Sequence, residues 1–289
     1  MIRYYVRVRT KEQLDAALLW GRASVLLPDG ELAGDSACVL SAVQSASDLL
    51  QIVLCLPDFL RQSRLALTEE TIRAFCQGTP QRTGLLVRSL DELGMIRGLR
   101  LQEHFQGRLI ADPFLYASNS EALRFYLDLF PELWFIGSDE LTDRELQQAL
   151  QNSPLSEEKM IIKVYGHQPL MISNQCLNRN HTNCTEHLTS FRDSRHERFF
   201  AAGNCRQCYS TIYNGKCTWL LDKVDEKGYA GYENLLLDFT VEDRARMEAV
   251  FSSIDEAERQ PGSRSGAGTS AAGTAFGDFT RAHHYKGVE

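Results

Sequence analysis

Short runs of β-forming residues alternate with helix-like segments along most of this chain, and this alternation limits the fold more than any other feature. Alternating βα units predict a parallel sheet. Eight such units favour a (β/α)8 barrel, with a doubly wound open sheet as the alternative. The expected strands are Arg3–Val8, Ser24–Leu27, Leu50–Leu56, Gly84–Val87, Arg108–Ala111, Leu133–Ile136, Lys159–Tyr165 and Asn234–Phe239.

Helix-start signals lie between several of these runs. Thr10 is followed at the capping-box position by Gln13. Ser89 precedes an expected helix that extends through Ile96, and Thr142 precedes another at Asp143–Leu150. A side-chain oxygen just before a helix satisfies backbone N–H groups that have no partner in the first turn. These signals therefore support helices between the strands.

Length and charge limit the class of protein. A chain of 289 residues can bury one large core or two smaller ones, and the net charge of −7 argues against broad coating of nucleic acid. The N-terminus shows no apolar run typical of a signal peptide, and the longest apolar stretches are strand-sized. The expectation is a cytoplasmic protein without a membrane span, where clustered cysteines indicate metal or redox chemistry.

Five of the eight cysteines lie close together in the sequence, at Cys176, Cys184, Cys205, Cys208 and Cys217. Cys205 and Cys208 form a C-x-x-C pair, and seven residues separate Cys176 from Cys184. Thiolates suit zinc or an iron–sulfur cluster, and two pairs supply four ligands. The spacing alone leaves zinc slightly ahead. Cys176, Cys184, Cys205 and Cys208 are the predicted ligands, and Cys217 is either a core residue, which we favour, or an alternative ligand.

Composition changes near the C-terminus. Residues 260–273 are rich in Gly, Ser and Ala and predict a flexible linker, followed by a tail rich in aromatic and ionisable residues. The tail either docks back on the body or is an ordinary surface segment. The predicted parts are a βα-repeat part of the barrel at 1–165, a cysteine-rich cluster-binding region with the last strand at 166–240, and the C-terminal helix, linker and docking tail at 241–289.

Four motifs resemble the peptidase U32, or collagenase-like, family. Val164–Cys176 resembles its "YG..PLM.S..C" opening, and Cys208–Gly215 resembles its "C…IYN" stretch. Leu236–Asp243 is similar to its "R.DFT.E" strand, and Phe279–Glu289 is similar to its "FTRGHFYRGVE" signature. The likeness covers most of the chain and is strongest from Leu86 onward.

The resemblance implies a barrel that carries a [4Fe–4S] cluster on four cysteines, with zinc as the alternative. Family members are labelled as peptidases, and others are oxygen-independent hydroxylases of tRNA or rRNA bases or of a ubiquinone precursor, with prephenate as the proposed oxygen source. This chain has no cysteine in Thr185–Arg198 and has Ala282 where the family usually has Gly, and comparison with the family leads us to expect that a preceding barrel module is missing. The missing module suggests a partner subunit.

Among these activities, the sequence motifs disfavour a peptidase. There is no G-x-S-x-G and no H-E-x-x-H, and the clustered thiols are those assigned to metal. We therefore expect an iron–sulfur-dependent hydroxylase that modifies a nucleobase in RNA or a small aromatic molecule. A U32 peptidase and a non-catalytic, cluster-bearing subunit are the alternatives.

Candidate active-site residues follow the expected strands or lie in the tail. Arg88 and Arg281 are expected to clamp the carboxylates of a prephenate-like diacid, because guanidinium groups bind carboxylates in a bidentate manner. In the tail, His283, His284 and Tyr285 are expected to act as acid–base or stacking groups once the tail folds over the barrel mouth. Each candidate also has an ordinary structural interpretation as a turn, cap or surface residue. The further candidates after strands are Asp112, Asn119, Tyr165 and His167, and those in the tail are His283, His284 and Tyr285.

Overall fold

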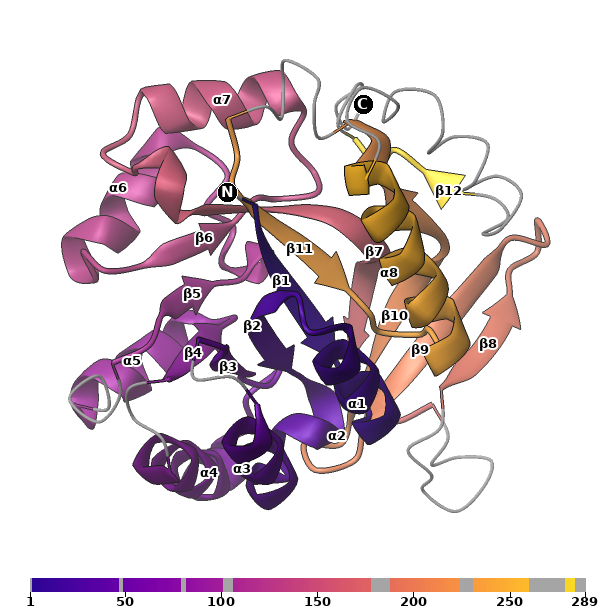
Figure 1. The fold of residues 1–289 in the computed structure, drawn as a ribbon. Coiled ribbons are helices and arrows are strands. Elements are labelled where there is room, and N and C mark those ends of the chain that lie inside the picture. Colours follow the sequence, from indigo (N-terminus) through magenta and orange to yellow (C-terminus); the bar gives the residue numbers. More distant parts are fainter. Residues whose placement is uncertain are drawn as a thin grey trace.

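The computed structural model describes residues 2–46, 49–78, 82–100, 106–177, 188–223, 231–259 and 279–283. Within these residues, eight parallel strands close into a barrel (Figure 1), because β11 pairs with both β1 and β7. The (β/α)8 prediction is confirmed, and the open-sheet alternative is wrong. The barrel strands are β1 (Arg3–Val8), β2 (Ala23–Pro28), β3 (Gln51–Cys55), β4 (Thr83–Val87), β5 (Leu109–Ala111), β6 (Trp134–Ile136), β7 (Met160–Ser173) and β11 (Asn234–Asp238).

Helices cover the outside of the barrel (Figure 1). The last of them packs against the first, with the rings of Trp20 and Phe251 stacked 4.2 Å apart. This contact joins the two ends of the βα series, which helps to hold the barrel closed. The helices are α1 (Lys11–Trp20), α2 (Gly30–Ala33), α3 (Ser36–Ser45), α4 (Leu65–Gly78), α5 (Leu90–Gly98), α6 (Ser120–Leu129), α7 (Asp143–Gln151) and α8 (Arg244–Arg259).

Local capping chemistry sets three of the helix starts. Thr10, Ser89 and Thr142 each accept a hydrogen bond from a backbone N–H in the first turn of α1, α5 and α7. The third helical residue of each completes a reciprocal capping box, which was predicted for Thr10 and Gln13. These signals act over four residues, so the sequence alone is sufficient to place them.

Side chains fill the barrel interior and pack separately from the layer between barrel and helices. The interior cluster takes alternate strand residues, because successive side chains of a strand point to opposite faces. Tyr5 points inward while Val6 packs toward the helices. The interior cluster consists of Tyr5, Val25, Leu27, Val53, Cys55, Leu86, Ile110, Ile136, Ile161 and Leu236.

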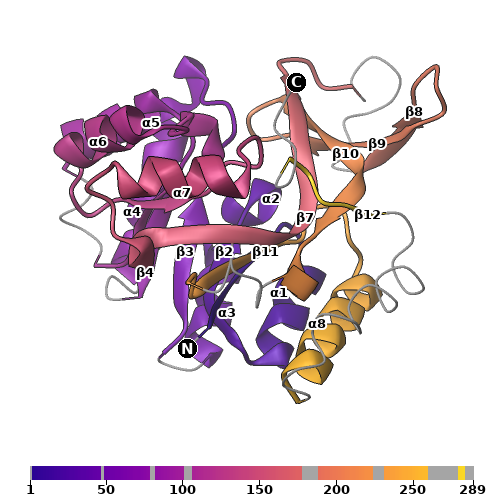
Figure 2. The ribbon, with the colours of Figure 1, turned by 90° about the horizontal axis from the view of Figure 1, so that it is seen from above.

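The predicted cysteine-rich metal-binding insertion is instead an antiparallel extension of the barrel sheet. The outer half of β7 leaves the barrel and pairs with β10 (Tyr209–Trp219), which continues through β9 (Arg198–Asn204) to β8 (Thr189–Arg192). Figure 2 shows this extension projecting from the barrel. The stretches between the cysteines contain several Phe, Tyr and Thr residues, which favour strands.

The C-terminal tail docks on this extension. The short strand β12 (Phe279–Thr280) pairs in parallel with β10, at Cys217 and Thr218. The predicted linker at 260–273, together with His284 and Tyr285, lies outside the described residues. No helix in the described ranges is long and apolar enough to cross a membrane. The cytoplasmic location stays a prediction.

Candidate active site at the barrel mouth

Each barrel strand brings an ionisable side chain to its carboxyl end. In (β/α)8 enzymes this face of the barrel carries the active site. Most of these side chains are buried, Asp238 to 2% exposure and Arg88 to 4%. The set, in strand order, is Arg7, Asp29, Asp58, Arg88, Asp112, Asp139, His167 and Asp238.

Two guanidinium groups organise four carboxylates in this set. Arg7 binds Asp112 Oδ2 through Nη2 at 2.8 Å and Asp238 Oδ2 through Nη1 at 3.0 Å. Arg88 binds Asp29 through Nη2 and Asp58 through Nη1, each at 2.7 Å. Its Nε lies 3.6 Å from Asp112 Oδ2, which joins the two groups into one network. Such pairing offsets the cost of removing these charges from water.

The network shifts the pKa values of two of its carboxyl groups in opposite directions. Burial, reinforced by the nearby Asp29 and Asp112, raises the pKa of Asp238 to about 6, although Arg7 and Lys163 oppose this change. Burial also opposes ionisation of Asp29, but its pairing with Arg88 holds the Asp29 pKa well below its usual range. Asp238 Oδ1 has no hydrogen-bond partner among the described residues. Carboxyls with separated pKa values are a common mark of acid–base sites.

Two further pairs extend the site along β6 and β7. Lys163 forms a buried ion pair with Asp139. His167 Nδ1 lies 2.6 Å from the carbonyl oxygen of Asn214, and its Nε2 lies 3.6 Å from Glu242 Oε1. Burial lowers the pKa of His167 despite the nearby Glu242. A neutral ring that donates from Nδ1 to the carbonyl leaves Nε2 as an acceptor.

The antiparallel extension covers one side of the mouth. From β10, Tyr213 accepts a hydrogen bond from Arg9 Nη1 at 2.7 Å, and Tyr209 Oη accepts one from the backbone N–H of Asp58 at 2.9 Å. Thr211 of the same strand donates its hydroxyl hydrogen to the Asp58 carboxylate. These contacts close the mouth over β1–β3.

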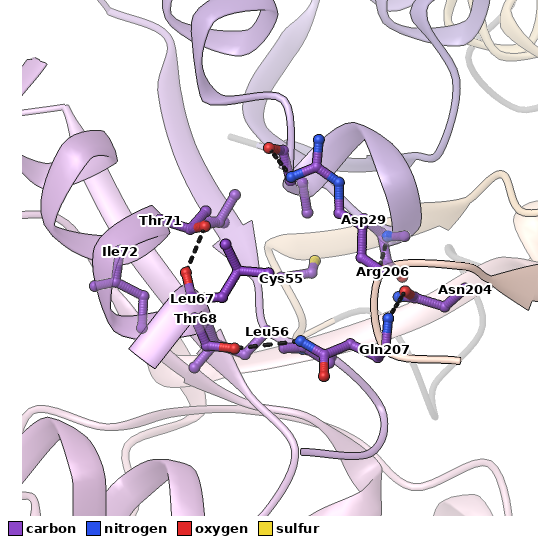
Figure 3. Close-up of a pocket in the computed structure, with 15 residues that line it drawn as sticks. Asp29, Cys55, Leu56, Leu67, Thr68, Thr71, Ile72, Asn204, Arg206 and Gln207 are labelled. Carbon is purple, nitrogen blue, oxygen red and sulfur yellow. Dashed lines mark hydrogen bonds between the residues drawn. The ribbon is translucent and has the colours of Figure 1, made fainter. Parts of the chain in front are cut away.

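A small cavity lies behind the covered side (Figure 3). Its volume of about 50 Å³ is enough for a few water molecules and too small for a substrate ring. Gln207 donates from Nε2 to Thr68 at 3.3 Å at its edge, while Cys55 and Asp29 line it from the barrel. This cavity can therefore hold water molecules next to Asp29, and it cannot hold a substrate.

An open groove lies on the other side, over the carboxyl ends of β5–β7. It measures about 470 Å³, within the usual size of ligand pockets. Ser118, Glu140, Gln168 and Leu170 line it, and the docked tail adds His283. Glu140 and Gln168 each follow a mouth residue, Asp139 and His167, so the groove lies beside the mouth at β6 and β7.

The structure gathers some of the predicted site residues and separates others. Arg88, Asp112 and His167 lie in the mouth. Tyr165 packs in the apolar core, with ring centroids 5.8 Å from Trp219 and 5.2 Å from Phe239. Outside the mouth, Asn119 caps α6 by accepting from the backbone N–H of Ala122.

The two arginines of the expected diacid clamp are already engaged. Arg281 binds the Asp222 carboxylate through both Nη atoms, and its Nη1 also donates to the carbonyl of Trp219. Arg88 holds Asp29 and Asp58. Each guanidinium thus neutralises a carboxylate of the chain itself, and the structure provides no diacid site between them.

The predicted cysteine ligands do not form a metal centre in the described residues. Cys176 is buried after β7, Cys205 and Cys208 lie in the turn between β9 and β10, and Cys217 is buried in the core of β10. Cys184 lies outside the described residues. Across those residues, no three His, Cys, Asp or Glu side chains are placed to hold a metal ion. The [4Fe–4S] cluster and its zinc alternative therefore stay predictions, and no chemical step is derived from them.

Sequence reasoning missed seven members of the site: Arg7, Asp29, Asp58, Asp139, Lys163, Asp238 and Glu242. A usable signal was present for two of them. Arg7 interrupts the β-forming run Tyr-Tyr-Val-Arg-Val, and Asp238 ends the apolar run Leu-Leu-Leu. A charged residue at the end of a buried parallel strand faces the functional edge of the barrel.

The fold and the site define an α/β-barrel protein with an ion-pair network at its mouth. No family model matches the chain, and no curated protein matches it. The resemblance to the U32 family and the partner subunit that it suggested therefore stay predictions.

Solved structures with a similar path of the chain exist at low identity. A chitinase from Chromobacterium violaceum ATCC 12472 is 11% identical, with a TM-score of 0.45 over 90% of this chain and 100% of that one. The C-terminal domain of a putative chitinase from Desulfitobacterium hafniense DCB-2 is 11% identical, with a TM-score of 0.42 over 88% and 98%. The Bacillus cereus spore cortex-lytic enzyme SleL is 9% identical, with a TM-score of 0.42 over 88% and 74%. Likenesses this distant say nothing about the substrate of this chain.

The structure corrects the predicted function, because the described cysteines form no metal-holding group and both arginines of the expected diacid clamp are already paired with carboxylates. The structures named above are chitinases and a cortex-lytic enzyme, and none of them is a U32 protein. The predicted iron–sulfur hydroxylase of RNA or a small aromatic molecule is wrong, as are its alternatives, the U32 peptidase and the cluster-bearing subunit. That prediction depended on cysteines that are close in sequence, and the described ones do not gather around one point.

Proposed function

We propose that this chain is an enzyme that hydrolyses a glycosidic bond at the barrel mouth. The observation that carries the proposal is the pair of buried carboxyls, Asp112 and Asp238, held by the single guanidinium of Arg7. Asp238 has a raised pKa of about 6, and its Oδ1 has no hydrogen-bond partner in the described part of the chain. It is therefore suited to hold a proton and to release it.

Glycoside hydrolysis needs two carboxyl groups in different protonation states. One donates a proton to the leaving oxygen, and the other stabilises the positive charge on the sugar or activates water. Asp238 Oδ1 supplies the proton as the carbon–oxygen bond breaks. Asp112 accepts a proton from the attacking water, and the next turnover begins once that proton has returned to Asp238.

Arg7 contributes to this chemistry by position and charge. It binds the Oδ2 atom of each carboxyl and so leaves the Oδ1 atom of Asp238 for proton transfer. Its positive charge stabilises Asp238 after the proton has left. The sequence carries no serine elbow and no HExxH motif for the main peptidase mechanisms, whereas two-carboxyl chemistry needs only groups that the mouth contains.

The test is a substrate panel with matched variants. Wild-type protein is assayed on nitrophenyl glycosides, on β-1,4-linked oligosaccharides and on peptides. Hydrolysis of a glycoside is expected, with a rate that falls as pH rises above about 6 because Asp238 then loses its proton. Asp238→Asn should lower kcat by roughly 10²–10⁴-fold.

Asp128→Asn, which alters an exposed carboxyl on α6, is the control and should keep full activity. The proposal fails if no glycoside is cleaved. It also fails if the Asp238→Asn protein, shown to be folded by circular dichroism, is as active as wild type.

A further inference from the structure

The groove over β5–β7 is assembled from segments that are far apart in the sequence. Ser118 follows β5, Glu140 and Leu141 follow β6, Gln168 to Leu170 belong to the outer half of β7, and His283 comes from the tail. Because four segments must meet to form it, the groove depends on the docked position of the tail.

Specific contacts hold the tail in this position. β12 pairs with β10, and Arg281 binds the carboxylate of Asp222, a side chain that is 2% exposed. Between Arg281 and His283, Ala282 has a φ of +49°, in the left-handed region that residues other than glycine rarely adopt. Its backbone N–H donates to the Thr280 hydroxyl at 3.1 Å. The ion pair and the left-handed turn together direct His283 into the groove.

The groove lies next to the mouth along two strands that carry mouth residues. On β7, Gln168 lies two residues beyond Gly166, which is the register partner of Asp238 on β11. Two strand residues span about 6–7 Å. On β6, the groove residue Glu140 follows Asp139, the partner of Lys163. The groove therefore begins about 6–7 Å along β7 from the strand position that pairs with Asp238, which is about the length of one sugar unit.

The lining combines an apolar wall with hydrogen-bonding groups. Leu141, Pro169 and Leu170 provide the wall, and Leu170 is left 48% exposed. Glu140, Gln168 and His283 supply donors and acceptors. A sugar ring has a matching surface, with C–H groups on its faces and hydroxyls around its edge. A wholly apolar ligand would leave the polar groups without partners, which is costly.

We propose that this groove binds the sugar unit next to the cleaved bond, with His283 as a residue that binds the substrate. The inference rests on the proposed glycoside hydrolysis and adds a second unit to the substrate. His283 positions the substrate from the tail and takes no part in proton transfer. Arg281 acts through His283, because it holds the tail in place.

Binding is measured without turnover, in Asp238→Asn protein, by calorimetry with β-1,4-linked tetramers of glucose and of N-acetylglucosamine. His283→Ala should weaken binding of one tetramer by roughly 5- to 10-fold, the effect of one lost hydrogen bond. His283→Gln, which keeps a side-chain donor, should restore part of the affinity. Arg281→Ala should weaken binding to a similar extent as His283→Ala. Glu121→Ala, on exposed α6, is the control and should bind like its parent.

The outcomes separate this inference from the proposed function. Tetramer binding that depends on His283, without hydrolysis by wild-type protein, would keep the groove and overturn the proposed function. Hydrolysis with an unchanged KM in His283→Ala would keep the proposed function and overturn the role of the groove. Failure of both tetramers to bind overturns the inference.

Discussion

Replacing Asp238 by Asn should change how the stability of the fold depends on pH. The pKa of Asp238 rises from 3.8 to about 6 on folding, mainly through burial. The folded state therefore holds this proton more tightly than the unfolded state. The resulting contribution to stability is fully present below about pH 4, and it is lost as pH rises through about 6. At 1.36 kcal/mol per pH unit, a shift of about 2 units corresponds to about 3 kcal/mol.

The assay is urea denaturation followed by circular dichroism at several pH values between 4 and 7.5. Asn cannot titrate, so the free energy of unfolding of Asp238→Asn, minus that of wild type, should increase by about 3 kcal/mol across this range. Asp128→Asn controls for loss of an exposed carboxyl. A difference that is constant with pH, or one that decreases, would refute the assignment of a raised pKa to Asp238.

Three further substitutions test the geometry of the mouth and the tail. Arg7→Leu leaves the buried carboxylates of Asp112 and Asp238 without their shared cation. It should therefore lower the free energy of unfolding, measured by urea denaturation, by about 3–5 kcal/mol. A loss below about 1 kcal/mol would contradict this expectation. Gly166→Ala places a Cβ 2.6 Å from the carbonyl oxygen of Asp238 at a φ of +140°. The substitution should therefore lower the free energy of unfolding by at least about 1–3 kcal/mol and also lower kcat. Unchanged stability and rate would contradict this close approach of the two strands. Ala282→Gly removes the backbone strain of about 1 kcal/mol at the left-handed position of Ala282. Because the tail is then held more firmly, hydrogen exchange of the Thr280 backbone amide should slow about fivefold. Faster exchange would contradict the strained turn.

The cysteine-rich region shows where inference from the sequence failed. Five cysteines crowd into one part of the chain, and that crowding suggested a ligand set. The residues between them form strands that carry Cys217 into the apolar core and leave Cys205 and Cys208 in a turn. Closeness in sequence limits how far apart two thiols can be, but the direction of each depends on strand pairing. That pairing is a long-range property.

The eight barrel strands, the capped starts of three helices and several members of the mouth could be predicted from the order of residues alone. Periodicity and capping depend on residues within a few positions of one another, so they survive without tertiary information. Arg88, Asp112 and His167 were predicted because they follow strands, and parallel strands end at one edge.

The partners of these residues depend on how the whole chain folds. Arg7 meets Asp112 and Asp238, which are 105 and 231 residues away in the chain. The raised pKa of Asp238 comes from burial and from neighbours on other strands. Barrel closure and the docking of the tail create these contacts, and both depend on the packing of the whole chain. Electrostatic interactions follow distance in space, and the order of residues along the chain does not specify that distance.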